Sequence, residues 1–416
     1  MGRSSVRVSR TIPIEPAPAS ALPAIVARQP ICNRYQRTFG YELLFRDLVT
    51  EECVFGSDDE ATSRVVFNSI VEIGLDKLVG QSRAFINFTR DFILSKNSSL
   101  LPRNRVVLEI LETSIPDPKF LGGLATLRMK GYRFALDDFN FQEQLLPFIP
   151  HCSFIKVDLR LVDRDRLIRE MPRLRALAAS MVAEKVETVE EFELCKELGF
   201  DYFQGYFFCK PKIVSAATMP TNRLTLCKLL SRLQQPDVTT GEVEAIMGEE
   251  PSLSYRLQRY INSAAIGMPR KIQSIRHAIR MVGLDHIRTL SSMVMLSSLD
   301  DKPRELIKTS VIRARMCQIL GEGPARQYGP YFTTGLFSTL EAFLDCSMEK
   351  ALEHLPLSDE ISNALLHRKG DKGRMLAAVI AYEKGDWTAL KRMNIEPEKI
   401  AKAYLDAVAW GEELLH

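Results

Sequence analysis

The stretch GYELLFRD, residues 40–47, reads as a buried strand that carries two charged side chains. Apolar and aromatic residues occupy both of its faces. Because side chains alternate along a strand, Glu42, Leu44 and Arg46 point to the same side. Burying a charge without a partner is costly. The carboxylate and the guanidinium of this strand therefore each need a partner of opposite charge.

Short strand-like runs alternate with helical patterns between residues 24 and 211. Besides the opening stretch, the strand candidates are AIVARQPI, AFINFT, VVLEIL, RFALDD, FIKVDL, MVAEKV and YFQGYFF. The clearest amphipathic stretches between them are residues 60–79 and 164–179. This alternation predicts a parallel sheet, and eight strand candidates favour a compact (β/α)8 barrel, hence an α/β fold. The alternative is an open doubly wound sheet, although no GxGxxG motif opens a helix here.

The second half of the chain has a different pattern. From about Met219 onward nearly every stretch has helical spacing, and no alternating strand pattern is visible. We therefore predict a separate all-α domain, joined to the barrel at residues 210–222 and able to fold independently of it. The expected division is a disordered tail at 1–22, a barrel domain at 23–211 and a helical domain at 212–416.

Composition excludes several classes of protein. The chain has 416 residues and a formal net charge of +3, which gives no electrostatic reason to expect nucleic-acid binding. No apolar run reaches the roughly 18 residues that span a bilayer, and the N-terminus lacks the apolar stretch of a secretory signal. Eight scattered cysteines without a CxxC pair indicate a reduced, cytoplasmic protein.

Polar residues recur at or near the carboxyl ends of the predicted strands, where a barrel carries its active site. They are Glu42, Asn87, Glu109, Asp137, Asp138, Lys156, Asp158, Glu184, Glu187 and Gln204. A single acidic residue at a strand end is more often a solvated edge or a helix cap. Five or more converging carboxylates would repel one another, and divalent cations relieve that repulsion.

Oxygen ligands with an asparagine carbonyl suit Mg²⁺ or Mn²⁺. Lys156 would balance charge or orient a water molecule. Two such cations would favour in-line attack on a phosphodiester, because they activate water and neutralise the leaving oxygen.

The motifs also resemble a known family. The series YELLFR, INFT, LEILE, DDF, IKVD, AEKVE and FQGY is similar to the EAL domain of cyclic di-GMP phosphodiesterases over residues 24–211. More narrowly, ARQPI followed by GYELLFRD and a helical second half resembles the bacterial EAL–HDOD signalling proteins. The resemblance implies hydrolysis of cyclic di-GMP to linear pGpG with Mg²⁺ or Mn²⁺.

The resemblance also assigns roles to individual residues. It implies metal ligation by Glu42, Asn87, Glu109, Asp137 and Asp138, and catalytic roles for Glu42, Lys156 and Glu184. It further implies substrate binding or support of the substrate site by Gln29, Arg46, Glu187 and Gln204. The charges of the opening stretch then have partners, a cation for Glu42 and a phosphate for Arg46.

Three features depart from the family pattern. Asn140 and Lys185 stand where the family has glycines, and the segment 139–155 is about two residues shorter and lacks a Gly-Ser-rich loop. No expected ligand is lost. Two functions therefore remain open: a phosphodiesterase that we expect to be slow, and a non-catalytic receptor or scaffold that binds cyclic di-GMP.

The helical half resembles the HDOD domain through its INSAA segment and the helix that follows. HD hydrolases need a His-Asp pair for metal, and none of the six histidines here is followed by Asp. We therefore assign this half no chemistry and expect it to bind an unknown protein partner. A homodimer is a further possibility. We expect neither membrane association nor direct nucleic-acid binding.

Overall fold

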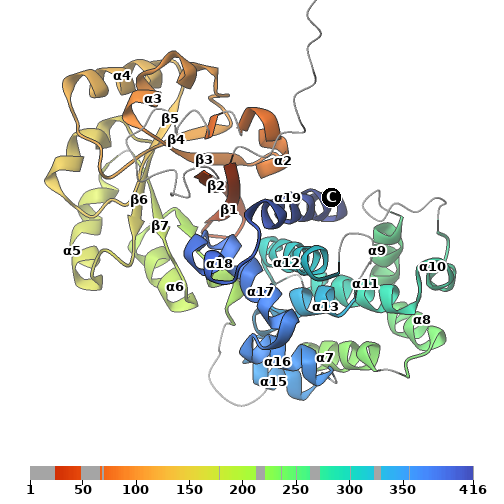
Figure 1. Ribbon diagram of the computed structural model, residues 1–416. Helices are drawn as coiled ribbons and strands as arrows, with labels where there is room; N and C mark the ends of the chain where they lie inside the picture. The colour runs from red at the N-terminus through yellow and green to blue at the C-terminus, as the bar shows by residue number, and fades with distance from the viewer. Residues whose placement is uncertain are drawn as a thin grey trace, which may run out of the picture.

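A computed structural model gives the structure of this protein (Figure 1). It describes residues 24–47, 66–67, 70–177, 179–211, 221–235, 237–249, 251–262, 272–299, 301–322, 329–355 and 357–415. The expected tail and most of the predicted joint lie outside these residues. The described part consists of a closed β-barrel and a group of helices that packs against it.

All eight predicted strands form and close into one barrel in chain order, which confirms the predicted barrel. They are β1 (Ala24–Asn33), β2 (Thr38–Asp47), β3 (Arg83–Phe88), β4 (Val106–Ile110), β5 (Arg133–Leu136), β6 (Phe154–Asp158), β7 (Ser180–Glu184) and β8 (Tyr202–Gln204). The expectation of an entirely parallel sheet is wrong for β1, which pairs antiparallel with both β2 and β8. Only residues 34–37 join β1 to β2, and a parallel connection needs a dozen or more residues.

Short helices connect the remaining strands. They are α2 (Leu75–Val79), α3 (Arg90–Leu94), α4 (Pro118–Met129), α5 (Arg164–Arg175) and α6 (Val189–Leu198), with 3-10 helices η1 (Lys96–Leu100), η2 (Glu143–His151) and η3 (Phe207–Cys209). Local sequence sets several of their ends: Asp117 caps α4, and Thr188 with Glu191 forms a capping box on α6. Pro147 and Pro150 lie inside η2. Proline inside an α-helix removes a backbone donor and clashes with the preceding turn, so a regular α-helix is disfavoured between β5 and β6.

The interior of the barrel has an apolar layer and a polar layer. The apolar layer contains Ile31, Phe85, Val107, Ala135, Phe154 and Val182, with Tyr202 packed against it. The polar layer contains Gln29, Glu42, Asn87, Glu109, Asp137, Lys156, Glu184 and Gln204. On every strand except β2, the polar residue lies two positions from a member of the apolar layer, toward the mouth of the barrel. The period of two along a strand thus puts seven of these polar side chains inside, and the contacts of Glu42 with Lys156 and Gln204 place it beside them.

The second half is helical wherever the structure describes it, as predicted. Its helices are α7 (Thr221–Gln234), α8 (Thr240–Gly248), α9 (Pro251–Ile261), α10 (Ile275–Val282), α11 (Leu284–Ser297), α12 (Arg304–Glu322), α13 (Pro330–Phe337), α14 (Leu340–Leu344), α15 (Met348–Glu353), α16 (Asp359–His367), α17 (Gly370–Glu383), α18 (Trp387–Arg392) and α19 (Pro397–Leu415). Among the helices of the described segments, none combines the length and apolar character needed to cross a bilayer.

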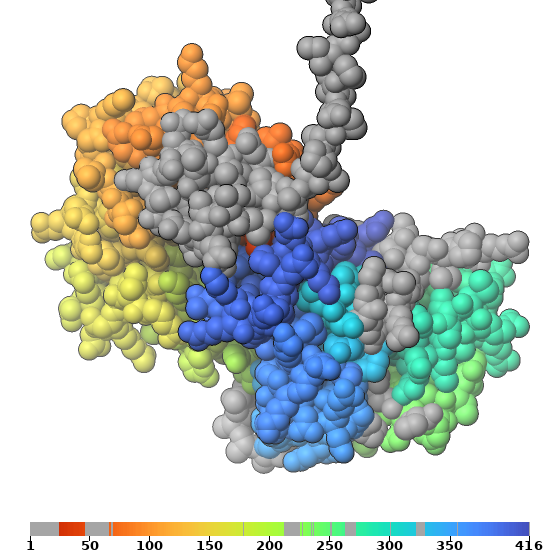
Figure 2. All heavy atoms as spheres, in the orientation of Figure 1, coloured from red at the N-terminus to blue at the C-terminus, as the bar shows by residue number. Residues whose placement is uncertain are grey.

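Helices α12, α17 and α19 cover the outer side of β1 and β2. Figure 1 shows α19 beside β1, and Figure 2 shows the same C-terminal segment, in blue, packed on the barrel. The Tyr404 hydroxyl of α19 accepts a hydrogen bond from the Arg28 amide (3.2 Å), and the Tyr382 hydroxyl of α17 donates to the Val26 carbonyl (2.8 Å). On α12, Glu305 accepts from the Tyr41 hydroxyl (3.0 Å).

These interface groups are buried, and one apolar cluster runs continuously from the barrel into the helices. Separating the two halves would expose this apolar surface to water, at about 25 cal/mol for each Å². The packing therefore argues against the expectation that the barrel and the helices fold independently.

Candidate active site in the mouth of the barrel

The ammonium group of Lys156 lies at the centre of four carboxylates. Its Nζ is 2.7 Å from Glu109 Oε1, 2.7 Å from Asp137 Oδ1, 2.9 Å from Glu184 Oε1 and 3.2 Å from Glu42 Oε2. Lys156 and Glu109 are both 0% exposed. These residues lie in β2, β4, β6 and β7 and directly after β5, so closure of the barrel brings together side chains that are far apart in the chain. One buried cation facing four carboxylates leaves the cluster short of positive charge.

Burial and mutual repulsion change the acidity of the cluster. Burial alone would lower the pKa of Lys156, but the surrounding carboxylates, Asp137 foremost, raise that pKa well above its usual value. Burial raises the pKa values of Glu109 and Glu184 well above the ordinary carboxyl range, and only Lys156 opposes this. Lys156 therefore keeps its proton and acts as a hydrogen-bond donor. The raised pKa values of Glu109 and Glu184 reflect burial first and the neighbouring carboxylates second, and an added cation would favour their ionised forms.

The carboxylates form two groups that share one residue. Glu42, Glu109 and Asp137 make the first group, and Asp137, Asp138 and Glu184 make the second. Within each group the potential ligand oxygens lie within 4.8 Å of one another. A carboxylate common to two ligand sets is the arrangement expected for a pair of cations with Asp137 between them.

Several oxygens at this site have no hydrogen-bond donor among the residues that the structure describes. They are Asn87 Oδ1, Glu109 Oε2, Glu184 Oε2 and Gln204 Oε1. Leaving a buried acceptor unpaired costs about 1–3 kcal/mol, more when it is charged. All four are hard oxygen atoms, which Mg²⁺, Mn²⁺ and Ca²⁺ accept. The donor set thus fits divalent cations.

The side chains of Gln204 and Gln29 extend the cluster to β8 and β1. Gln204 Nε2 donates to Glu42 Oε2 and also to Gln29 Oε1, at 3.1 Å from the latter. Asn87 Nδ2 lies 3.4 Å from Glu42 Oε1. Gly205 follows in the left-handed region at φ 144°, and a Cβ there would lie 2.0 Å from the Val186 carbonyl. Only glycine allows β8 to approach the end of β7 this closely.

Two residues directly after cluster carboxylates have left-handed backbones. Asp138 has φ 44° and Lys185 has φ 55°. Burial, followed by the neighbouring Asp137, raises the pKa of Asp138 to about 6. Lys185 Nζ pairs with the buried carboxylate of Asp158. Lys185 therefore adds a second cation at the edge of the site, where the family pattern has glycine.

The structure thus brings nine of the predicted site residues together in one region. These are Gln29, Glu42, Asn87, Glu109, Asp137, Asp138, Lys156, Glu184 and Gln204. Glu187 is exposed, and its Oε2 lies 3.1 Å from Arg160 on the surface. The side chain of Arg46 lies outside the described residues, so the expected phosphate contact has no structural account.

The sequence places Asp158 among the polar residues at the strand ends and Lys185 at a family glycine, but it does not predict that they pair with each other. Asp158 lies two positions after Lys156, so the alternation that identified the polar layer also points to it. Lys185 gives no such signal, because its neighbour Glu184 occupies the interior position. Its contact with Asp158 depends on the turn that follows β7.

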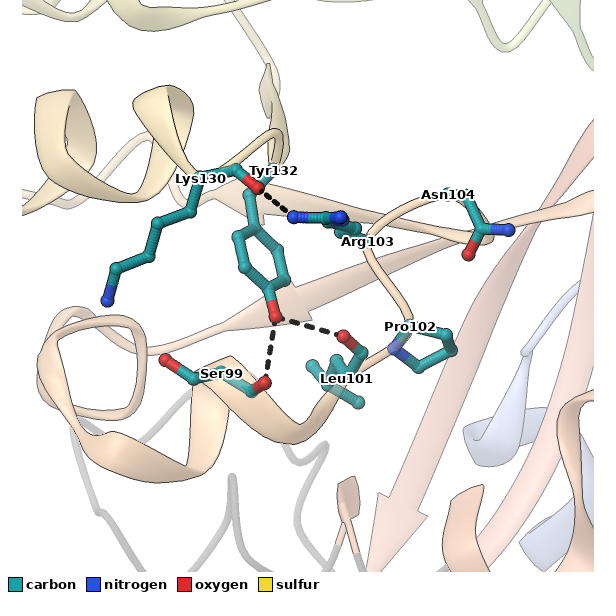
Figure 3. Close-up of a pocket in the computed structure, with 7 residues that line it drawn as sticks. All are labelled: Ser99, Leu101, Pro102, Arg103, Asn104, Lys130 and Tyr132. Carbon is teal, nitrogen blue, oxygen red and sulfur yellow. Dashed lines mark hydrogen bonds between the residues drawn. The ribbon is translucent and has the colours of Figure 1, made fainter.

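A separate pocket of about 480 Å³ lies at the opposite end of the barrel (Figure 3). Residues preceding β4 and β5 line it, with the Tyr132 hydroxyl donating to the carbonyls of Ser99 (2.9 Å) and Leu101 (3.0 Å). None of the predicted site residues lines this pocket. The candidate site is therefore the polar layer at the mouth.

Two domain families match the chain in the predicted order. The EAL domain model matches residues 71–211, and the HDOD domain model matches residues 219–355. The chain is 33% identical over 402 residues to the cyclic di-GMP phosphodiesterase CdgJ of Vibrio cholerae, covering 94% of this chain and 92% of that protein. The chain belongs to the EAL–HDOD family. The uncharacterized protein YuxH of Bacillus subtilis is another relative, 32% identical over 406 residues, with 94% of this chain and 98% of that protein covered.

Solved structures align with part of this EAL–HDOD protein. Klebsiella pneumoniae BlrP1, in a manganese and cyclic di-GMP complex, aligns at 22% identity and a TM-score of 0.37, covering 45% of this chain and 55% of that one. Bacillus subtilis YkuI, in complex with cyclic di-GMP and calcium, aligns at 18% identity and a TM-score of 0.37, covering 63% and 72%. At these scores the family assignment rests on the sequence relatives and the domain models.

Proposed function

We propose that this protein hydrolyses cyclic di-GMP to linear pGpG, with two divalent cations, Mg²⁺ or Mn²⁺, held in the mouth of the EAL barrel. The observation that carries the proposal is the pair of carboxylate groups that share Asp137. The name of the V. cholerae relative supports the choice of substrate. The unpaired buried oxygens of Asn87, Glu109 and Glu184 support metal binding.

Each residue of the cluster has a part in this proposal. Glu42, Asn87, Glu109 and Asp137 would hold one cation, and Asp137, Asp138 and Glu184 the other. Bound cations would lower the pKa of water and neutralise the leaving oxygen of the phosphodiester. Lys156 keeps its proton because of its carboxylate neighbours, so it orients the carboxylates and an attacking water as a donor. Glu184 acts in this proposal as a ligand of the second cation, so a proton on its carboxyl group would compete with that cation.

The test is direct. The purified chain of 416 residues is incubated with cyclic di-GMP and Mg²⁺ or Mn²⁺, and pGpG is followed by chromatography, with Glu42→Gln as the matched inactive variant. We expect slow turnover that needs the metal and is lost in the variant. The slow rate follows from the short segment after Asp138, because a misplacement of about 1 Å costs on the order of a hundredfold.

A parallel titration with Ca²⁺ separates the phosphodiesterase from the receptor. Ca²⁺ has longer bonds and looser geometry, so it should support nucleotide binding with little hydrolysis. Binding without any pGpG, even at high Mn²⁺, would make the protein a receptor. All the expected carboxylate ligands are present, which favours the enzyme.

We further propose that the HDOD domain binds a protein partner and that the chain acts in the cytoplasm, with a homodimer as a possible assembly. In the part of the chain that the structure describes, six cysteines are free thiols and five of these are buried. Free thiols are expected in a reducing compartment. Affinity capture with the whole chain as bait tests whether the HDOD domain binds a protein partner. Light scattering of the purified chain tests dimerisation. A monomer at all concentrations would exclude the homodimer.

A further inference from the structure

The turn after α17 belongs to the helical half but lies at the mouth of the barrel. Tyr206, two residues after β8, donates its hydroxyl to the Glu383 carbonyl at 2.7 Å. A Cβ on Gly385 would lie 3.1 Å from Leu44, which is on the same face of β2 as Glu42 and closer to the mouth. The turn of residues 383–386 is thus a rim element supplied by a segment far from the barrel in sequence.

A series of hydrogen bonds through the side-chain amides of Gln29 and Gln204 connects this turn to Glu42, a candidate metal ligand. Gln29 Nε2 lies 3.5 Å from the Lys384 carbonyl, a long hydrogen bond. Because the amide nitrogen of Gln29 faces that carbonyl, its Oε1 faces Gln204 Nε2, at 3.1 Å. The second hydrogen of the same Gln204 nitrogen goes to Glu42 Oε2.

These hydrogen bonds fix the orientation of both side-chain amides. A backbone carbonyl only accepts hydrogen bonds, so it selects the Gln29 orientation in which the oxygen points to Gln204. Gln204 must then present its nitrogen to Gln29 and Glu42, which leaves its own oxygen unpaired and buried. Without the Lys384 carbonyl the Gln29 amide is free to turn, and the Gln204 nitrogen, which still faces the carboxylate of Glu42, loses its second fixed acceptor.

The position of the turn is set within the helical half. Glu383 forms a buried ion pair with Arg313 of α12, at 2.8 Å. The same helix carries Glu305, which accepts hydrogen bonds from Thr38 (2.8 Å) and Tyr41 (3.0 Å) of β2. Helix α12 lies inside the HDOD match, so any shift of that domain against β2 moves the turn as well.

We propose that residues 383–386 are a positioning element of the active site, and that through Gln29 and Gln204 they hold Glu42 ready for its cation. The inference rests on the proposed function only in treating Glu42 as a metal ligand. It makes a turn of the helical half, beyond the HDOD match at residues 219–355, a support for the active site of the barrel. The helical half then regulates the site without carrying a catalytic residue.

The test compares two tyrosine variants in the full chain. Tyr206→Phe removes the anchor of the turn and leaves Gln29, Gln204 and Glu42 intact. Tyr132→Phe is the matched control, because its hydroxyl also donates to backbone carbonyls but lies at the far end of the barrel (Figure 3). Both changes should lower Tm by a similar amount, since each costs about 1 kcal/mol of hydrogen bonding.

Mn²⁺ affinity is measured by calorimetry without nucleotide, and turnover separately. We expect Tyr206→Phe to weaken Mn²⁺ binding about fivefold, equivalent to about 1 kcal/mol, and Tyr132→Phe to leave it unchanged. Gln29→Leu should weaken binding at least as much. The double variant Gln29→Leu/Tyr206→Phe should bind Mn²⁺ as tightly as Gln29→Leu alone, because both changes interrupt the same series of hydrogen bonds. In turnover assays, kcat at fixed Mn²⁺ should fall while KM for the nucleotide holds.

Two results would overturn the inference: equal Mn²⁺ affinity in the two tyrosine variants, or losses that multiply in the double variant. A wild-type chain that binds Mn²⁺ but releases no pGpG would instead refute the proposed function. The calorimetric comparison would still decide whether the turn positions Glu42.

Discussion

Replacing Lys156 with methionine should destabilise the metal-free protein strongly. Methionine fills nearly the same volume but removes the cation that four carboxylates share at 2.7–3.2 Å. Removing one member of a buried ion pair costs about 3–5 kcal/mol, because a charge is left buried without compensation. For a domain of this size, about 2–4 °C of Tm accompanies each kcal/mol, so Tm should fall by about 6–20 °C.

The pH dependence of this loss follows from the neighbouring carboxyl groups. Burial already raises the pKa values of Glu109 and Glu184, and the loss of Lys156 removes what opposes this. A carboxyl group with a raised pKa binds protons more tightly in the folded state, so its cost to stability grows as the pH rises. The Tm difference between Lys156→Met and wild type should therefore be larger at pH 8 than at pH 5.

Thermal melts with a chelator and then with Mn²⁺ measure the effect. Bound Mn²⁺ replaces the missing positive charge. At 100 times its Kd it should raise the free energy of unfolding by about 2.7 kcal/mol. Lys119→Met is the control, because Lys119 is exposed on α4 and its loss should change stability by no more than about 0.5 kcal/mol. If Lys156→Met and wild type melted within about 2 °C of each other without metal at pH 8, the charge argument would be refuted.

Three further predictions concern single residues of the site. Glu42→Gln should abolish metal-dependent turnover. The Tm of the metal-free variant should stay the same or rise, because the change removes one of several mutually repelling carboxylates. Full activity would exclude a metal-ligand role for Glu42. Asp138→Asn should raise Tm of the metal-free protein above pH 6 but not at pH 4. The pKa of Asp138 is about 6 in the folded state against the usual 3.8, so its carboxyl group lowers stability increasingly as the pH rises from 3.8 to 6. A Tm difference that did not depend on pH would contradict this. Lys185→Gly should strengthen Mn²⁺ binding about fivefold in calorimetric titrations, because it removes a positive charge that interacts with the expected ligands Asp138 and Glu184. Weaker binding would show that Lys185 supports the site.

The sequence by itself determined the strands, the layer of polar side chains and most of the candidate ligands. Strand alternation has a period of two, so a polar residue two positions from a buried apolar residue points to the same side in any barrel. Capping residues such as Asp117 and Thr188 likewise act within a few positions of the chain. Such local rules hold whatever the rest of the molecule does.

Tertiary structure alone decided the direction of β1, the central place of Lys156 and the contact between the helical half and the site. The Lys384 carbonyl lies 355 positions from Gln29 in the chain, and Tyr404 lies 376 positions from Arg28. No local pattern encodes such pairs, because they arise only when the helices bury the outer side of β1. A backbone carbonyl also carries no residue-specific signal, so only the packing of α17 against the barrel could reveal the part it plays at Glu42.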